Sequence, residues 1–186
     1  MSSRSQGLNY YAAKKLGPDH PNAKRKYTLG DVNTSLIRAS NGITVTLYYD
    51  PQTPRPVDFI YRIQGTKGIY SGTLNKIYLE DFSPKPHEWE DIEKYQQQYD
   101  HPLWSKYGSI AQSSGHGGSD YLCFRDFVLA VRNRTEVPVD VYDAATWSII
   151  TALTEQSVTH KSQPVDFPDF TRGQWQTRKP IPIEAS

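Results

Sequence analysis

Residues 35–49 read Ser35-Leu36-Ile37-Arg38-Ala39-Ser40-Asn41-Gly42-Ile43-Thr44-Val45-Thr46-Leu47-Tyr48-Tyr49, two β-prone runs separated by an Asn-Gly pair. Asn-Gly between β-branched and aromatic residues is a strong local signal for a β-hairpin. In the second run apolar residues alternate with Thr44, Thr46 and Tyr48, and a period of two places the two sets on opposite faces of a strand. The stretch therefore predicts an antiparallel hairpin with one apolar face and one face of mixed character.

Three further β-prone segments follow the hairpin, at residues 58–63, 68–71 and 76–80. The first two are joined by residues 64–68, which are rich in turn-forming residues. We therefore predict a mostly antiparallel meander over residues 30–81.

After Pro86 the pattern of apolar residues changes to the period of a helix. Helices are predicted over residues 87–98, 105–113 and 119–133. In the third helix an apolar stripe recurs at helical spacing: Tyr121, Phe124, Val128 and Val131. Asp140 then predicts the start of a fourth helix, with Asp143 in the reciprocal capping position.

Strands followed by helices indicate an α+β fold, with an open, mostly antiparallel sheet and helices on one face. We interpret the chain as one domain with a lead-in segment over residues 1–29, a sheet over 30–81, helices over 82–160 and an extended tail over 161–186. Three aromatic side chains are expected to anchor the tail: Phe167, Phe170 and Trp175.

Charge and composition exclude several classes of function. Lys and Arg number 21 against 20 Asp and Glu, so no electrostatic argument favours nucleic acid or an anionic membrane as a partner. No apolar run is long enough to span a bilayer, and the polar residues 1–7 predict no signal peptide in this segment. Cys123 is the only cysteine, which excludes a disulfide or a cysteine zinc site within one chain, and we expect a buried, inert thiol.

The most unusual segment is Gly115-His116-Gly117-Gly118-Ser119-Asp120, in which three glycines bracket a histidine just before a predicted helix. Glycines allow a ligand to approach the backbone closely, and His116 could exchange hydrogen bonds with a sugar hydroxyl or move a proton. An exposed loop histidine with no function is the alternative. The spacing is not the G-x-G-x-x-G of a dinucleotide site, and no βαβ unit surrounds it.

Other candidate chemistry is weaker. The remaining histidines show no metal-ligand spacing: His20, His87, His101 and His160. Glu88 and Glu90 lie two residues apart on a predicted helix, so they point in different directions and do not form a glycosidase carboxylate pair. We therefore predict no metal site.

Five segments together resemble the C-terminal domain of glucose–fructose oxidoreductase-like (Gfo/Idh/MocA) proteins, and most of all the glycoside hydrolase family 109 branch, known for α-N-acetylgalactosaminidases. They are residues 30–34 (GDVNT), 64–68 (QGTKG), 115–121 (GHGGSDY), 140–147 (DVYDAATW) and 168–175 (PDFTRGQW). The resemblance covers nearly the whole chain.

The resemblance implies a parent enzyme with an N-terminal Rossmann domain that binds NAD(P) and a C-terminal α+β domain whose open sheet often forms a subunit interface. In that branch NAD⁺ takes a hydride from sugar C3, the glycosidic bond at C1 is broken by elimination, and water adds. No Rossmann domain is recognisable here, so this chain alone is expected to bind no NAD and to be inactive. Implied contacts with the carbohydrate substrate are His116, Asp120, Tyr121 and Arg55, with His116 positioning a hydroxyl rather than abstracting a proton.

The sequence departs from the pattern of this branch at one position. The branch places a substrate-contacting Tyr soon after a Pro-Arg pair, but Pro54-Arg55 is followed by Pro56-Val57, and Tyr61 is the nearest phenol.

A plain NAD(P)-dependent sugar dehydrogenase and a non-catalytic carbohydrate-binding or dimerisation module are the competing interpretations. A homo-oligomer through the open sheet is a further expectation. For a bacterial protein, a cytoplasmic location and export are the two alternatives.

Overall fold

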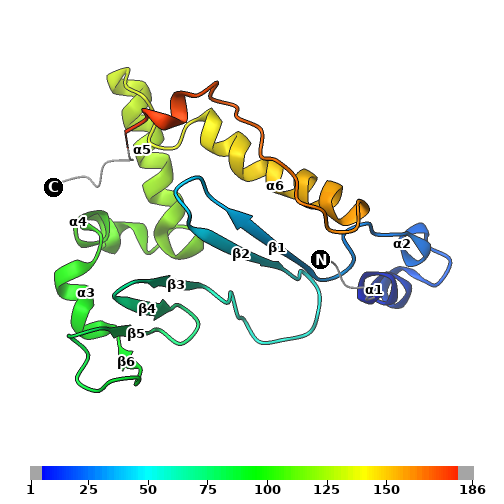
Figure 1. The fold of residues 1–186 in the computed structure, drawn as a ribbon, viewed down its shortest axis with the longest axis horizontal. Helices are drawn as coiled ribbons and strands as arrows, with labels where there is room; N and C mark the ends of the chain where they lie inside the picture. The colour runs from blue at the N-terminus through cyan, green and yellow to red at the C-terminus, as the bar shows by residue number, and fades with distance from the viewer. Residues whose placement is uncertain (1–5, 180–186) are drawn as a thin grey trace. The chain divides into compact units, whose positions relative to one another are not determined.

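The computed structural model describes residues 6–179 and contains helices together with small, open antiparallel sheets (Figure 1). This confirms the predicted α+β class. The chain divides into two compact units. One unit holds the residues up to Ile60 together with Thr146–Pro168, and the other holds Tyr61–Ala145 and the residues from Asp169 onward.

The first unit contains the predicted hairpin, formed by β1 (Asn33–Arg38) and β2 (Thr44–Tyr49). Ile37 lies opposite Val45 in the antiparallel register, and Gly42 takes a φ of 89° in the connecting turn. That backbone conformation strains a residue with a Cβ atom, which explains glycine after Asn41. The hairpin is confirmed.

Helices α1 (Gly7–Leu16) and α2 (Pro21–Lys24) precede the hairpin, and the sequence analysis identified neither. Asp31 fixes the start of α1 because its carboxylate accepts hydrogen bonds from the backbone N–H groups of Gly7 and Leu8, at 2.5 and 3.2 Å. These two N–H groups have no acceptor within the helix itself. Asp31 is buried, with an exposed fraction of 2%.

Helix α6 (Val141–Thr159) begins as predicted. Asp140 accepts hydrogen bonds from the backbone N–H groups of Tyr142 and Asp143, and Asp143 accepts one in return from the N–H of Asp140. Further along α6, the hydroxyl groups of Thr154 and Ser35 are hydrogen-bonded at 3.0 Å, which ties the helix to β1.

The second unit contains a separate antiparallel sheet of four strands in the order β3 (Arg62–Gly65), β4 (Gly68–Ser71), β5 (Lys76–Leu79) and β6 (Glu90–Asp91). In the described residues the strands therefore form two sheets, and the single meander over residues 30–81 is wrong. The strand predicted from Asp58 starts only at Arg62, because Ile60 takes a φ of 47° and donates its N–H to the Asp58 carboxylate. Such a turn interrupts an extended strand.

Three helices complete this unit: α3 (Glu93–Tyr99), α4 (Pro102–Ala111) and α5 (Ser119–Asn133). The bounds of α5 agree with the prediction. The helix predicted from His87 begins only at Glu93, since His87 has a φ of 62° and Glu90 pairs with Ile77 in the sheet. The Glu88–Glu90 segment is therefore not helical, and Glu90 instead accepts hydrogen bonds from Ser83 and Tyr95.

The buried side of α5 differs from the prediction. Leu122 and Ala130 are buried, whereas Phe124 is 72% exposed and Val131 is 61% exposed. Periodicity locates an apolar stripe but not what covers it, and three of its members, Phe124, Val128 and Val131, are at least half exposed. Cys123 is likewise exposed, which corrects the expectation of a buried thiol.

The tail is irregular up to a short 3₁₀ turn, η2 (Gln174–Gln176). Of the three predicted anchors, Phe170 is half-buried, whereas Phe167 and Trp175 are 40% and 46% exposed. The last part of the predicted tail, residues 180–186, lies outside the described residues. Among residues 6–179, no helix is both long and apolar enough to cross a bilayer.

Candidate functional site

The glycine-rich segment forms a tight turn between α4 and α5, and includes the 3₁₀ turn η1 (His116–Gly118). Three successive residues have left-handed backbone angles, with φ values of 52° at His116, 66° at Gly117 and 101° at Gly118. A Cβ atom at Gly118 would lie 3.0 Å from the Trp104 ring and 3.1 Å from the Ala111 methyl group. Glycine at position 118 therefore serves both the turn and the close packing of α4 beneath it.

His116 and Asp120 lie together at the start of α5. The imidazole Nδ1 is 3.0 Å from each carboxylate oxygen of Asp120, and the His116 side chain is 85% exposed. A carboxylate can only accept hydrogen bonds, so the neutral imidazole carries its proton on Nδ1 when it makes this contact. The Nε2 lone pair is then left for another partner, such as a hydroxyl group.

Tyr121 is held beside this pair through its backbone, because its N–H donates to the Ser114 hydroxyl at 3.2 Å. The backbone N–H of Ser114 in turn donates to the Ala111 carbonyl at 2.8 Å. Three of the four predicted site residues, His116, Asp120 and Tyr121, thus lie in the turn and in the first turn of α5 that follows it.

A contact that the sequence analysis missed joins the two helices below the turn. Arg125 on α5 donates to the Tyr107 hydroxyl at 2.8 Å, and its guanidinium lies 4.1 Å from the centre of that ring. The two residues are 18 positions apart, and no local pattern predicts such a pairing. The cation–π and hydrogen-bonding contacts together link α4 to α5, the two helices that flank the turn.

Arg55, the fourth predicted site residue, belongs to the first unit. Its Nη1 lies 2.9 Å from the Asp50 carboxylate, and its Nη2 donates to the Asp50 backbone carbonyl. Hydrogen bonding from Thr53 lowers the pKa of Asp50 below its usual range, and the charge of Arg55 lowers it further. Arg55 thus holds its own loop together, while Val57 beyond it is 85% exposed.

Two of the remaining histidines have structural roles. The Nδ1 atoms of His20 and His101 accept hydrogen bonds from the backbone N–H groups of Asn22 and Leu103, at 3.2 Å in both cases, and so cap α2 and α4. Within residues 6–179, no three His, Cys, Asp or Glu side chains gather into a metal-binding group.

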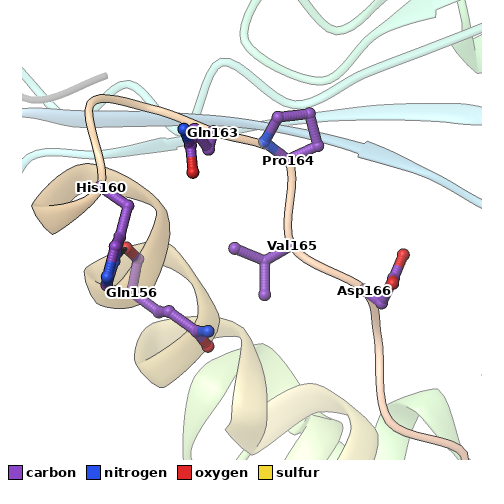
Figure 2. Close-up of a pocket in the computed structure, with 6 residues that line it drawn as sticks. All are labelled: Gln156, His160, Gln163, Pro164, Val165 and Asp166. Carbon is purple, nitrogen blue, oxygen red and sulfur yellow. Dashed lines mark hydrogen bonds between the residues drawn. The ribbon is translucent and has the colours of Figure 1, made fainter.

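A pocket of about 390 Å³ lies in the first unit, between the end of α6 and the tail. Figure 2 shows its lining: Gln156, His160, Gln163, Pro164, Val165 and Asp166. Just after the end of α6, the Nδ1 atom of His160 lies 2.8 Å from the backbone carbonyl oxygen of Gln156. The four predicted sugar-contacting residues do not line this pocket, so we do not regard it as the sugar site.

The glycine-rich turn does not fit a nicotinamide dinucleotide. It joins two helices, α4 and α5, whereas the dinucleotide fingerprint joins a parallel strand to a helix within a βαβ unit. The described sheets are antiparallel. The polar groups that the turn and the start of α5 present are the His116 imidazole and the Asp120 carboxylate, which contact each other.

The sequence is similar to one family of sugar-cleaving enzymes. A family model described as glycosyl hydrolase 109, C-terminal domain, matches residues 1–177. The chain is 45% identical over 180 residues to an α-N-acetylgalactosaminidase of Tannerella forsythia, covering 97% of the chain and 38% of that protein. It is 44% identical over 182 residues to a glycosyl hydrolase family 109 protein of Stenotrophomonas maltophilia, covering 97% of the chain and 40% of that protein. The chain thus spans about two fifths of the length of the curated relatives it matches.

Proposed function

Because this chain belongs to the family of glycosyl hydrolase 109 C-terminal domains, we propose that it supplies the sugar-contacting turn of an NAD-dependent glycosidase. The substrate class is an α-N-acetylgalactosaminide, as the name of the Tannerella forsythia relative suggests. The turn over residues 115–121 contacts the sugar, and the nicotinamide cofactor is held by another part of the intact protein.

One observation carries this proposal: the exposed His116 imidazole is oriented by Asp120 on a glycine-bracketed turn at the start of α5. In the neutral ring the Nε2 lone pair accepts a hydrogen bond from a sugar hydroxyl, and in the charged ring Nε2 donates one to a sugar oxygen. A Cβ atom at Gly117 would point into open space, so the surface beside the ring is uncrowded there and a bulky pyranose can approach.

A chimera tests the proposal. Here this chain replaces the matching part of the Tannerella forsythia enzyme, and the reaction is followed on an aryl α-N-acetylgalactosaminide and, separately, on free sugars with NAD⁺. Release of the aryl alcohol supports a glycosidase. Reduction of NAD⁺ by free sugar without cleavage of the glycoside would instead identify a sugar dehydrogenase. A folded chimera that contains NAD but does neither would contradict both.

A second candidate, a dimerisation or docking module, is favoured by the exposed apolar side chains. On α5 these are Phe124, Phe127, Val128 and Val131, all at least half exposed, and on β1 Leu36 is 76% exposed. Apolar surface of this kind is commonly covered by another polypeptide. Sedimentation of the isolated chain tests it, because a monomer at all concentrations would contradict self-association.

A further inference from the structure

We propose that Asp120 is a positioning residue: it holds the His116 imidazole in the tautomer with the proton on Nδ1, so that Nε2 faces the ligand as an acceptor. Both carboxylate oxygens lie 3.0 Å from Nδ1, so either can accept its proton. The sequence-based expectation was that Asp120 contacts the sugar itself. In this proposal it acts through His116, and the catalytic consequence rests on the function proposed above.

Gly115 provides independent support. Its own backbone angles, φ −61° and ψ 162°, are ordinary for any residue, so conformational freedom does not explain the glycine. A Cβ atom at position 115 would instead collide with the Asp120 Oδ2 oxygen. Glycine at this position therefore leaves room for the carboxylate beside the imidazole.

The position of Asp120 on the helix also suits this task. It lies in the first turn of α5, where its negative charge is favourable near the helix N-terminus. The Asp120 side chain is 55% exposed, so the position of its carboxylate depends on the contact with His116 and not on burial. In histidine chemistry generally, the hydrogen bond made by one ring nitrogen determines which state the other presents.

These two features lead to a paired test. Asp120→Ala removes the carboxylate, whereas Gly115→Ala leaves it in the protein but pushes it away from the imidazole. Asp126→Ala is the matched control, because it removes an equal charge from the same helix at a carboxylate that pairs with Arg125. The chain is labelled with ¹⁵N-histidine, and the ring nitrogen shifts are recorded at alkaline pH, where imidazoles are neutral. Loss of one signal set in His116→Ala assigns the resonances.

We expect His116 in the unmodified chain to be mainly in the Nδ1–H form, and to lose that preference in Asp120→Ala and in Gly115→Ala but not in Asp126→Ala. Circular dichroism checks that each variant is folded. A wild-type His116 mainly in the Nε2–H form, or an unchanged tautomer in both folded test variants, would overturn the proposal. Sugar plays no part in this measurement, so its failure is separate from failure of the proposed function.

Discussion

Arg178 in the tail donates two parallel hydrogen bonds to the Asp143 carboxylate at the start of α6, at 2.8 and 2.7 Å, across 35 residues of sequence. The same guanidinium lies 3.3 Å from Asp140. Both acidic residues also cap α6, so one arginine ties the tail to the beginning of that helix. Paired hydrogen bonds of this kind are directional and stronger than single ones between neutral groups.

This contact predicts a pH dependence of stability. Hydrogen bonding from Arg178 holds the pKa of Asp143 below its ordinary value of 3.8. Because the folded pKa is the lower one, the stabilisation is fully present above the unfolded pKa and is lost as the pH falls through the folded pKa. The free energy of unfolding should therefore fall more steeply on acidification below about pH 4 in the wild type than in Arg178→Met.

Urea denaturation at several pH values measures that slope. The control is Lys179→Met, which removes a neighbouring exposed cation and should keep the wild-type slope. Equal slopes in wild type and Arg178→Met would show that the ion pair contributes nothing to stability.

Because the buried Asp31 carboxylate caps α1, removing this side chain should lower the stability of the fold. Asp31→Ala leaves the N–H groups of Gly7 and Leu8 without their carboxylate acceptor, so the free energy of unfolding should fall by about 1–2 kcal/mol. Asp19→Ala, which removes an exposed partner of Lys24, should change it by less than about 1 kcal/mol. Similar losses in the two variants would argue against the capping role.

In the hairpin turn, replacing Gly42 should lower stability through backbone strain and not through a steric clash. Gly42→Ala places a methyl group in open space, but it forces alanine to a φ of 89°, so stability should fall by about 1 kcal/mol. Gly65→Ala also points into open space and lies in β3, where alanine is tolerated, so its effect should be near zero. Thermal unfolding of the two variants side by side isolates the backbone strain, because neither methyl group meets another atom within 4 Å.

In the active chimera, His116→Ala should lower kcat/KM by at least about tenfold, which corresponds to roughly 1.4 kcal/mol of transition-state binding. The reason is loss of a group that positions the sugar, so NAD content and melting temperature should stay unchanged. His160→Ala is the matched control, since its ring contacts a helix carbonyl in the other unit. Unchanged kinetics in His116→Ala would identify an exposed loop histidine with no role.

Local patterns in the sequence located several elements directly. Asn41-Gly42 between two β-prone runs predicted the hairpin, since few residue pairs fit that turn, and Asp140 with Asp143 predicted the start of α6. The motif at residues 115–121 was recognisable for the same reason. Gly117 and Gly118 meet local requirements of backbone angle that operate within a few positions.

Tertiary structure decided what local patterns could not. The division of the strands into two sheets depends on which strands pair, and the exposure of the α5 stripe depends on what packs against it. Asp31 caps a helix that starts 24 positions earlier, and Arg178 reaches Asp143 over 35 positions. Glycine at position 115 reads as a flexible residue in the sequence, but in the fold it leaves room for the Asp120 carboxylate. Contacts between distant residues form only when the chain has folded, because their partners are chosen by packing rather than by sequence spacing.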